Sequence, residues 1–175
     1  MDTIVVYKTK YGSTECYAKY IAEKLGCEAF DAKSVKVDKL LEYDRIVYGG
    51  GLYAEVINGL SLITKNIEKL SDKKIAVFTT GITPLDCRAY YDGEVLEKNF
   101  KNGVPENIRI FNLLGKMKSD ELSLPHRTAL AALKKIMQAR KNPTEMEKLL
   151  VELCDADGDF TNLEDADALI EYMKG

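Results

Sequence analysis

The stretch Thr9-Lys10-Tyr11-Gly12-Ser13-Thr14-Glu15 decides the fold of this chain, because it separates an apolar run from an amphipathic one. Residues 3–8, which precede it, are mostly β-branched or aromatic, and this pattern predicts a strand buried on both faces. Residues 13–25 place their apolar side chains on one helical face, and Gly26 follows as a C-cap. The stretch is therefore predicted to be the turn between the first strand and the first helix.

This turn carries four hydroxyl side chains and a glycine at the expected N-terminus of a helix. The hydroxyls belong to Thr9, Tyr11, Ser13 and Thr14. Unpaired amides and the positive end of the helix dipole favour an anion at such a position. The turn lacks the Lys-Ser/Thr ending of nucleoside-triphosphate loops and the three spaced glycines of dinucleotide sites. It predicts a site for one phosphate monoester, and an ordinary turn with a Ser or Thr cap is the alternative.

Strand-like apolar runs recur along the chain and alternate with helical segments. Strands are predicted at residues 27–31, 43–48, 75–78 and 108–111, and helices at residues 60–70 and 95–100. This alternation indicates an open, doubly wound α/β sheet, in which ligands bind beyond the carboxyl ends of the strands.

Two further glycine-containing stretches follow predicted strands. Gly49-Gly50-Gly51 and Thr79-Thr80-Gly81 are both expected to form loops. Together with the first turn, they are expected to meet at one edge of the sheet. Such a site suits a flat ring with a phosphate tail, and flavin mononucleotide (FMN) is the predicted cofactor.

The later part of the chain is predicted to be largely helical. One helix places Leu130, Leu133 and Met137 on one face. A second begins near Pro143, and its stripe is expected to be buried; the stripe consists of Met146, Leu149, Leu150 and Leu153. Residues 160–164 predict a capping box for a last helix with Leu163, Ala166, Ile170 and Met173 facing inward. We predict a single domain over residues 1–175, with a helical insert around residues 113–160.

Composition excludes several classes of protein. The 175 residues are 46% hydrophobic, which is enough to bury the core of one domain. The net charge of -3 offers no basic field for nucleic acid, so no nucleic-acid partner is expected. The sequence has no leader pattern and no apolar run near the roughly 18 residues of a spanning helix. We expect a cytoplasmic protein; peripheral membrane contact is left open without being favoured.

The cysteines, the single histidine and the acidic stretch around Gly158 do not predict a metal site or a catalytic group. Four cysteines without CxxC spacing and a single histidine predict free thiols and no metal site. A calcium loop around Gly158 would place Leu153 at the first ligand position, which cannot bind the ion. His126 is expected to be a polar cap or surface residue, and Cys87 an inert loop thiol. No catalytic side chain is predicted.

The three loops resemble those of the flavodoxin family. The residues that carry the resemblance are Thr9-Lys10-Tyr11-Gly12-Ser13-Thr14, Gly49-Gly50-Gly51-Leu52-Tyr53 and Thr79-Thr80-Gly81-Ile82-Thr83-Pro84. The family's phosphate loop has Thr or Ser, any residue, Thr, Gly, any residue and Thr, and Tyr11 replaces its third member. The resemblance implies a flavodoxin-like sheet of about five parallel strands in the order 2-1-3-4-5, with helices on both faces.

The resemblance also implies which residues bind FMN. Residues 9–14 would hold the phosphate, while residues 50–53 and 80–83 would flank the ring. The full predicted set is Thr9, Lys10, Tyr11, Gly12, Ser13, Thr14, Gly50, Gly51, Leu52, Tyr53, Thr80, Gly81, Ile82 and Thr83. Tyr53 is the candidate for stacking on the ring, and a surface tyrosine packed on a helix is the alternative. Negative charge near the ring, from Glu55, Asp86 and Asp92, predicts a low reduction potential.

The predicted function is electron transfer, of one or two electrons, through a bound flavin. The partners would be redox proteins or a small electron acceptor. The insert resembles the subgroup that includes the menaquinone-dependent protoporphyrinogen oxidase, so an FMN-dependent oxidoreductase acting on a quinone- or porphyrinogen-like substrate is the alternative. A non-flavin interaction module on the same fold is the second alternative. A phosphoacceptor receiver domain is set aside, because Tyr48 and Lys8 stand where that class needs acidic residues.

Overall fold

The computed structural model describes residues 2–175, whose main sheet has six strands. Five of them are parallel: β1 (Thr3–Lys8), β2 (Ala29–Asp31), β3 (Arg45–Tyr53), β5 (Lys74–Gly81) and β6 (Ile108–Leu114). They lie in the spatial order β2-β1-β3-β5-β6. The short strand β4 (Val56–Ile57) pairs antiparallel with the end of β3. Counted along the chain, the parallel strands lie in the order 2-1-3-4-5, which confirms the predicted fold class.

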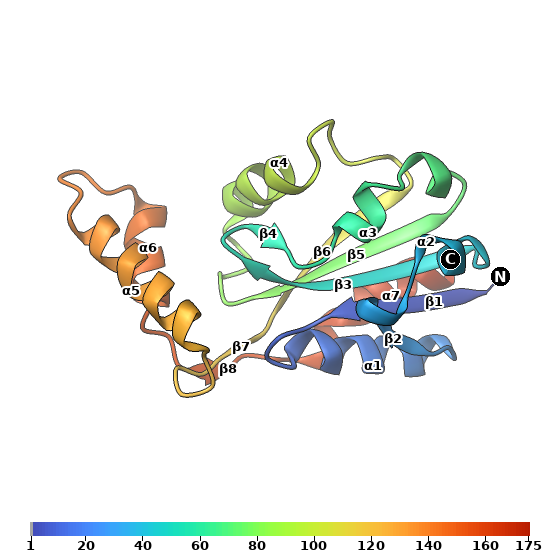
Figure 1. Ribbon diagram of the computed structural model, residues 1–175, viewed down its shortest axis with the longest axis horizontal. Coiled ribbons are helices and arrows are strands. Elements are labelled where there is room, and N and C mark those ends of the chain that lie inside the picture. The colour runs from blue at the N-terminus through green and yellow to red at the C-terminus, as the bar shows by residue number, and fades with distance from the viewer. Residues whose placement is uncertain (1) are drawn as a thin grey trace.

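Helices cover both faces of this sheet (Figure 1). Alternate strand residues point to opposite faces, so Ile4 and Val5 belong to two different cores. Helices α1 (Ser13–Leu25) and α7 (Asp167–Lys174) pack on the face of Val5. Helices α2 (Val37–Leu41), α3 (Ser61–Thr64) and α4 (Leu96–Asn99), with the π-helical segment Tyr90–Val95, lie on the other face. Among residues 2–175, no helix is long and apolar enough to cross a membrane.

The glycine-rich stretches after the third and fourth predicted strands are not loops, so that prediction is wrong. Residues 49–51 continue β3 and residues 79–81 continue β5. A Cβ on Gly49 would lie 2.1 Å from Phe78 Cζ, and one on Gly50 would lie 2.7 Å from Ile57 Cγ2. Glycine at these positions therefore admits closely packed neighbours. The chain turns later, at Ala54 and Glu55, whose φ values are 48° and 63°.

A helical hairpin, residues 124–153, lies between β6 and the last helix and projects from the body of the sheet (Figure 1). It consists of α5 (Leu124–Gln138) and α6 (Glu145–Leu153). At its base, β7 (Lys116–Met117) and β8 (Gly158–Asp159) form an antiparallel pair. Neither helix contains a fully buried side chain, so the predicted burial of the α6 stripe is wrong. The reason is that the hairpin packs mainly on itself, not on the sheet.

The capping box is also in a different place from the predicted one. It forms at the start of α6, where Glu147 N donates to Thr144 Oγ1 and Thr144 N donates to Glu147 Oε2. At the predicted position, the Asn162 side chain makes no cap bond, and its Nδ2 instead donates to Asp165 Oδ1 at 2.8 Å. The chain there enters a 3-10 turn, Leu163–Ala166, before α7. The inward-facing residues Ala166, Ile170 and Met173 are buried as predicted, whereas Leu163 is only partly buried.

Candidate functional site

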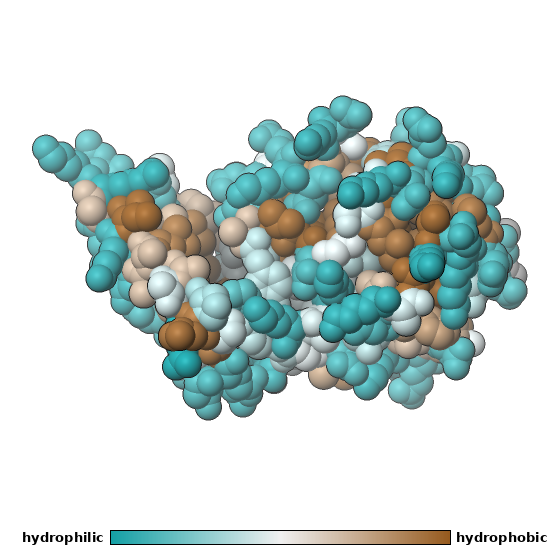
Figure 2. Space-filling model, in the orientation of Figure 1, coloured by the Kyte–Doolittle hydropathy of each residue, from teal (hydrophilic) through white to brown (hydrophobic). Residues whose placement is uncertain are grey.

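A cavity of about 540 Å³ lies where the carboxyl ends of the central strands face the hairpin. Figure 2 shows the notch between the hairpin and the rest of the molecule, with hydrophobic side chains on the hairpin. Most of the predicted cofactor-binding residues line this cavity: Thr9, Tyr11, Ser13, Thr14, Gly51, Leu52, Tyr53, Thr80, Gly81, Ile82 and Thr83. The other three, Lys10, Gly12 and Gly50, are sequence neighbours of lining residues. The parallel register brings these three distant segments to one edge of the sheet.

One end of the cavity is polar and lies at the N-terminus of α1. Gly12 precedes this helix with a φ of 93°, a left-handed conformation that favours glycine. The Thr9 hydroxyl oxygen accepts a hydrogen bond from Gly12 N at 2.9 Å. The Ser13 hydroxyl oxygen accepts one from Lys116 N at 3.0 Å, and the Thr14 and Thr80 hydroxyls lie 2.8 Å apart. The hydroxyl oxygens of Thr9 and Ser13, and one oxygen of the Thr14–Thr80 pair, therefore already accept a hydrogen bond from within the protein.

The hydrogens of the same hydroxyls remain available to a ligand. Each hydroxyl has one hydrogen to donate. Within residues 2–175, no group accepts the hydroxyl hydrogen of Thr9 or of Ser13. The Thr14 and Thr80 hydroxyls share one hydrogen bond, which uses only one of their two hydroxyl hydrogens. The first amides of α1 add further donors beside the positive end of the helix dipole. These donors have no acceptor in the part of the chain that the structure describes. They therefore fit an ionised phosphate group, whose oxygens accept hydrogen bonds.

The middle of the cavity is aromatic. The Tyr53 ring lies 6.4 Å from the Tyr11 ring and 5.4 Å from the His126 ring, measured between centroids. A Cβ on Gly51 would lie 3.2 Å from the Tyr53 ring, so glycine there gives the ring room. Burial, and to a lesser extent Tyr11, raises the pKa of Tyr53 to about 12, so its phenol stays neutral. Tyr53 therefore lines the cavity, and its ring also lies beside His126 in the first turn of α5.

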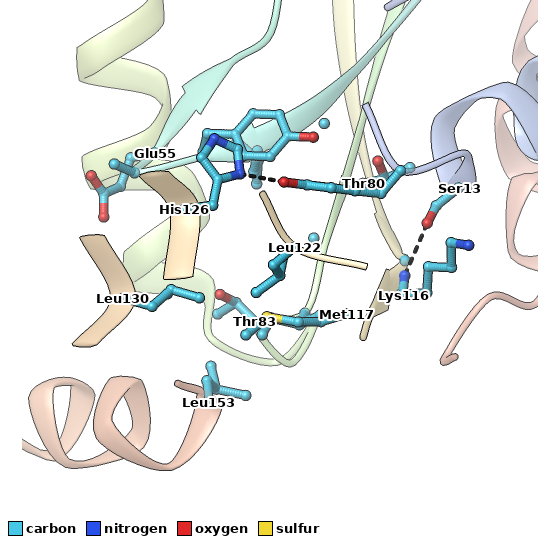
Figure 3. A pocket seen from close by; sticks show the side chains of 18 of the residues that line it. Ser13, Glu55, Thr80, Thr83, Lys116, Met117, Leu122, His126, Leu130 and Leu153 are labelled. Atoms are coloured by element: carbon cyan, nitrogen blue, oxygen red, sulfur yellow. Dashed lines mark hydrogen bonds between the residues drawn. The ribbon is translucent and has the colours of Figure 1, made fainter. Parts of the chain in front are cut away.

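The side of the cavity formed by the hairpin is apolar, and the sequence analysis did not assign it to the site. The hairpin contributes Ala129, Leu130, Leu133, Leu150 and Leu153 to it, and Met117, Leu122 and Cys154, which flank the hairpin in the sequence, complete it. Figure 3 shows Leu122, Leu130 and Leu153 on one side of the pocket, away from Ser13 and Lys116. Helical spacing predicted an apolar stripe on each helix of the hairpin, one with Leu130 and Leu133 and the other with Leu150 and Leu153. It carried no information about the surface that each stripe faces.

His126 also lines the cavity, and the sequence analysis left it outside the site. It lies in the first turn of α5, and its Nδ1 is 2.6 Å from the hydroxyl oxygen of Tyr11 in the turn between β1 and α1. Burial, with a smaller contribution from the Lys10 charge, lowers the pKa of His126, so the imidazole is neutral near neutral pH. His126 is partly exposed at a helix start, and the expectation of a polar cap or surface residue did not include its contact with Tyr11, which lies 115 residues away in the sequence.

Charged residues around the cavity are mostly paired. Glu55 lines the cavity, and its carboxylate lies 2.5 Å from Lys98 Nζ. Lys116 Nζ lies 3.0 Å from the Glu121 carboxylate. These ion pairs reduce the charge that Glu55 and Lys116 present to a ligand, which weakens the basis for the predicted low reduction potential. In the described part of the chain, all four cysteines are free and no cluster of potential metal ligands occurs.

Comparison with known proteins gives one family match and several structural neighbours. The flavodoxin domain model matches residues 4–147. A flavodoxin from the domain Archaea is 17% identical, with 89% of this chain and 97% of that chain covered and a TM-score of 0.41. Flavodoxin 2 of Bacillus cereus is 22% identical, with 69% of this chain and 90% of that chain covered and a TM-score of 0.43. The Trp repressor binding protein of Bacillus subtilis is 14% identical, with 75% of this chain and 96% of that chain covered and a TM-score of 0.48. No curated protein sequence matches the chain. The family assignment rests on the domain match and not on these distant neighbours.

Proposed function

Because the chain belongs to the flavodoxin domain family, we propose that it binds FMN and transfers one or two electrons through it. The observation that carries this proposal is the set of unused hydroxyl donors at the start of α1, beside an aromatic cavity. The donors match a phosphate, and the cavity of about 540 Å³ lies within the usual range for small-molecule sites. Redox proteins or a small electron acceptor are the proposed partners.

Each part of the site has a distinct task in this proposal. Thr9, Ser13 and the Thr14–Thr80 pair would hold the phosphate, and Tyr53 would cover the ring. The leucines of the hairpin would exclude water from the ring. Bound FMN supplies the electron chemistry, so the protein needs no acid–base pair of its own.

The test is the uptake of flavin by the purified, flavin-free chain. Titration of FMN and of riboflavin, followed by the fluorescence of the flavin, is expected to show one binding site with higher affinity for FMN. Riboflavin lacks the phosphate and serves as the matched ligand. A chain that binds neither compound would contradict the proposal and favour a non-flavin interaction module on this fold.

The apolar side of the cavity favours a second candidate function. We infer that, if the chain is not a carrier, it acts as an FMN-dependent oxidoreductase on a flat, uncharged, quinone-like substrate. The hairpin leucines suit such a substrate, and the insert resembles the protoporphyrinogen oxidase subgroup. A porphyrinogen-like substrate carries carboxylates and is less well matched, since Lys116 is already paired with Glu121.

Stopped-flow oxidation of the reduced FMN-loaded protein by a soluble quinone distinguishes the carrier from the oxidoreductase. For the oxidoreductase, Leu130→Asp is expected to slow the reaction about tenfold, because it removes apolar contact and adds a charge to the substrate side. Ile136→Asp, on the same helix but 60% exposed and outside the cavity, is the control. Equal rates for wild type and both variants would contradict the oxidoreductase.

A further inference from the structure

Three side chains join the phosphate loop to the first turn of the hairpin. Lys10 Nζ lies 3.2 Å from His126 Nε2, and His126 Nδ1 lies 2.6 Å from the Tyr11 hydroxyl oxygen. The main-chain N–H of Ser123 also points to this oxygen, at 3.4 Å. Figure 3 shows the bond made by His126 at the wall of the pocket. Lys10 and Tyr11 come from the turn after β1, and Ser123 and His126 from the start of α5.

The lysine sets the direction of the hydrogen bonds in this group. A lysine ammonium has three donors and no acceptor, so His126 Nε2 must be the acceptor of the Lys10 bond. A neutral imidazole carries one N–H, which then lies on Nδ1 and donates to the Tyr11 oxygen. The lowered pKa of His126 is consistent with a neutral ring.

The Tyr11 oxygen consequently receives two hydrogen bonds, one from His126 and one from Ser123. Its own hydrogen has no acceptor among residues 2–175. We propose that Lys10 and His126 are positioning residues that fix the Tyr11 hydroxyl as a hydrogen-bond donor to a ligand in the cavity. The identity of that ligand as FMN rests on the proposed function, whereas the direction of the hydrogen bonds does not.

This arrangement explains how a tyrosine serves in a loop where the family has a small hydroxyl residue. The Tyr11 side chain reaches from the turn to His126 at the start of the hairpin. Hydrogen bonds in a directed chain polarise one another, so a ligand acceptor on Tyr11 strengthens the bonds to His126 and Lys10. Ligand binding and the attachment of the hairpin to the phosphate loop are therefore coupled.

The first test reads the tautomer of His126 directly. His126 is the single histidine of the chain, so nitrogen-15 NMR of histidine-labelled protein gives one imidazole signal pair. Above the ordinary histidine pKa of about 6.5, the flavin-free protein is expected to show the Nδ1–H tautomer. The Nε2–H tautomer would overturn the proposal. This measurement needs no flavin, so it is independent of the proposed function.

Two substitutions at Lys10 test whether the lysine sets the tautomer. Lys10→Met removes the donor, so the N–H is expected to move to Nε2 and Tyr11 to donate to Nδ1. Lys10→Arg keeps a cationic donor and is expected to retain the Nδ1–H tautomer. Lys24→Met, in the last turn of α1, is the control for loss of a positive charge. An unchanged tautomer in Lys10→Met would overturn the role of Lys10.

The donor role of Tyr11 is tested by Tyr11→Phe, which removes the hydroxyl and keeps the ring. FMN affinity is expected to fall about tenfold, the effect of losing one good hydrogen bond. An equal loss for riboflavin places the acceptor on the ring or its sugar-like chain, and a loss for FMN alone places it on the phosphate. If wild type binds FMN and Tyr11→Phe binds it equally well, the donor role is overturned while FMN binding stands.

Discussion

Replacing Ser13 by aspartate is expected to weaken FMN binding about a thousandfold. The Ser13 hydroxyl lies at the start of α1 and lines the polar end of the cavity. A carboxylate there would face the phosphate, and two unit charges about 4 Å apart repel by about 4 kcal/mol near a protein surface. An acidic residue in the first turn suits the helix dipole, so the variant is expected to fold. Titration with FMN and riboflavin measures the effect, and riboflavin affinity is expected to change much less.

The control for this prediction is Cys16→Asp. Cys16 lies in the same helix but is exposed and does not line the cavity. It receives the same change in charge, so net charge and the helix dipole are matched. An equal loss of FMN affinity in both variants, or an equal loss of FMN and riboflavin in Ser13→Asp, would contradict a phosphate site at Ser13.

Replacing Gly49 by alanine is expected to destabilise the fold by about 3 kcal/mol. The new Cβ would lie 2.1 Å from Cζ of Phe78, a fully buried ring on the neighbouring strand that also packs edge-on against Tyr17. Neither strand has space to move, because both are central in the sheet. Overpacking of a core costs about 1–3 kcal/mol, and this overlap is at the upper end. Denaturant unfolding measures the change.

Two further variants show whether contact with Phe78 causes the effect. Gly93→Ala adds a Cβ with nothing within 4 Å, so its free energy of unfolding is expected to stay within about 0.5 kcal/mol of wild type. Phe78→Leu shortens the side chain that the new Cβ meets. In the double variant Gly49→Ala/Phe78→Leu, the loss is expected to be at least about 1 kcal/mol smaller than the sum of the single losses. Additive losses would contradict the packing explanation.

Local patterns in the sequence predicted the first strand, the turn and the first helix with the bounds that the structure has. Residues 3–8 form β1, and residues 13–25 form α1 with Gly26 as its C-cap. Such patterns succeed because strand and helix periodicity, and the left-handed C-cap, are properties of neighbouring residues. The alternation of strands and helices predicted an open, doubly wound sheet, because crossover connections leave few topologies, whereas the order of the strands came from the resemblance to the flavodoxin family.

The prediction from local patterns was wrong for the glycines at residues 49–51, because glycine can indicate either a turn or close packing. A glycine permits a tight turn, and it also permits close approach of a neighbour. Gly49 and Gly50 serve the second purpose, because Phe78 and Ile57 occupy the space of their side chains. The sequence contains both partners, but only the sheet register brings Phe78 beside Gly49.

The sequence by itself determined the α/β alternation, the hydroxyl-rich turn and the apolar stripes of the hairpin, because each depends on residues within a few positions of one another. Only the tertiary structure decided what those stripes face and that His126 meets Tyr11. Contacts between segments a hundred residues apart depend on how the whole chain packs, and a local pattern records which face of a helix is apolar but not what covers it.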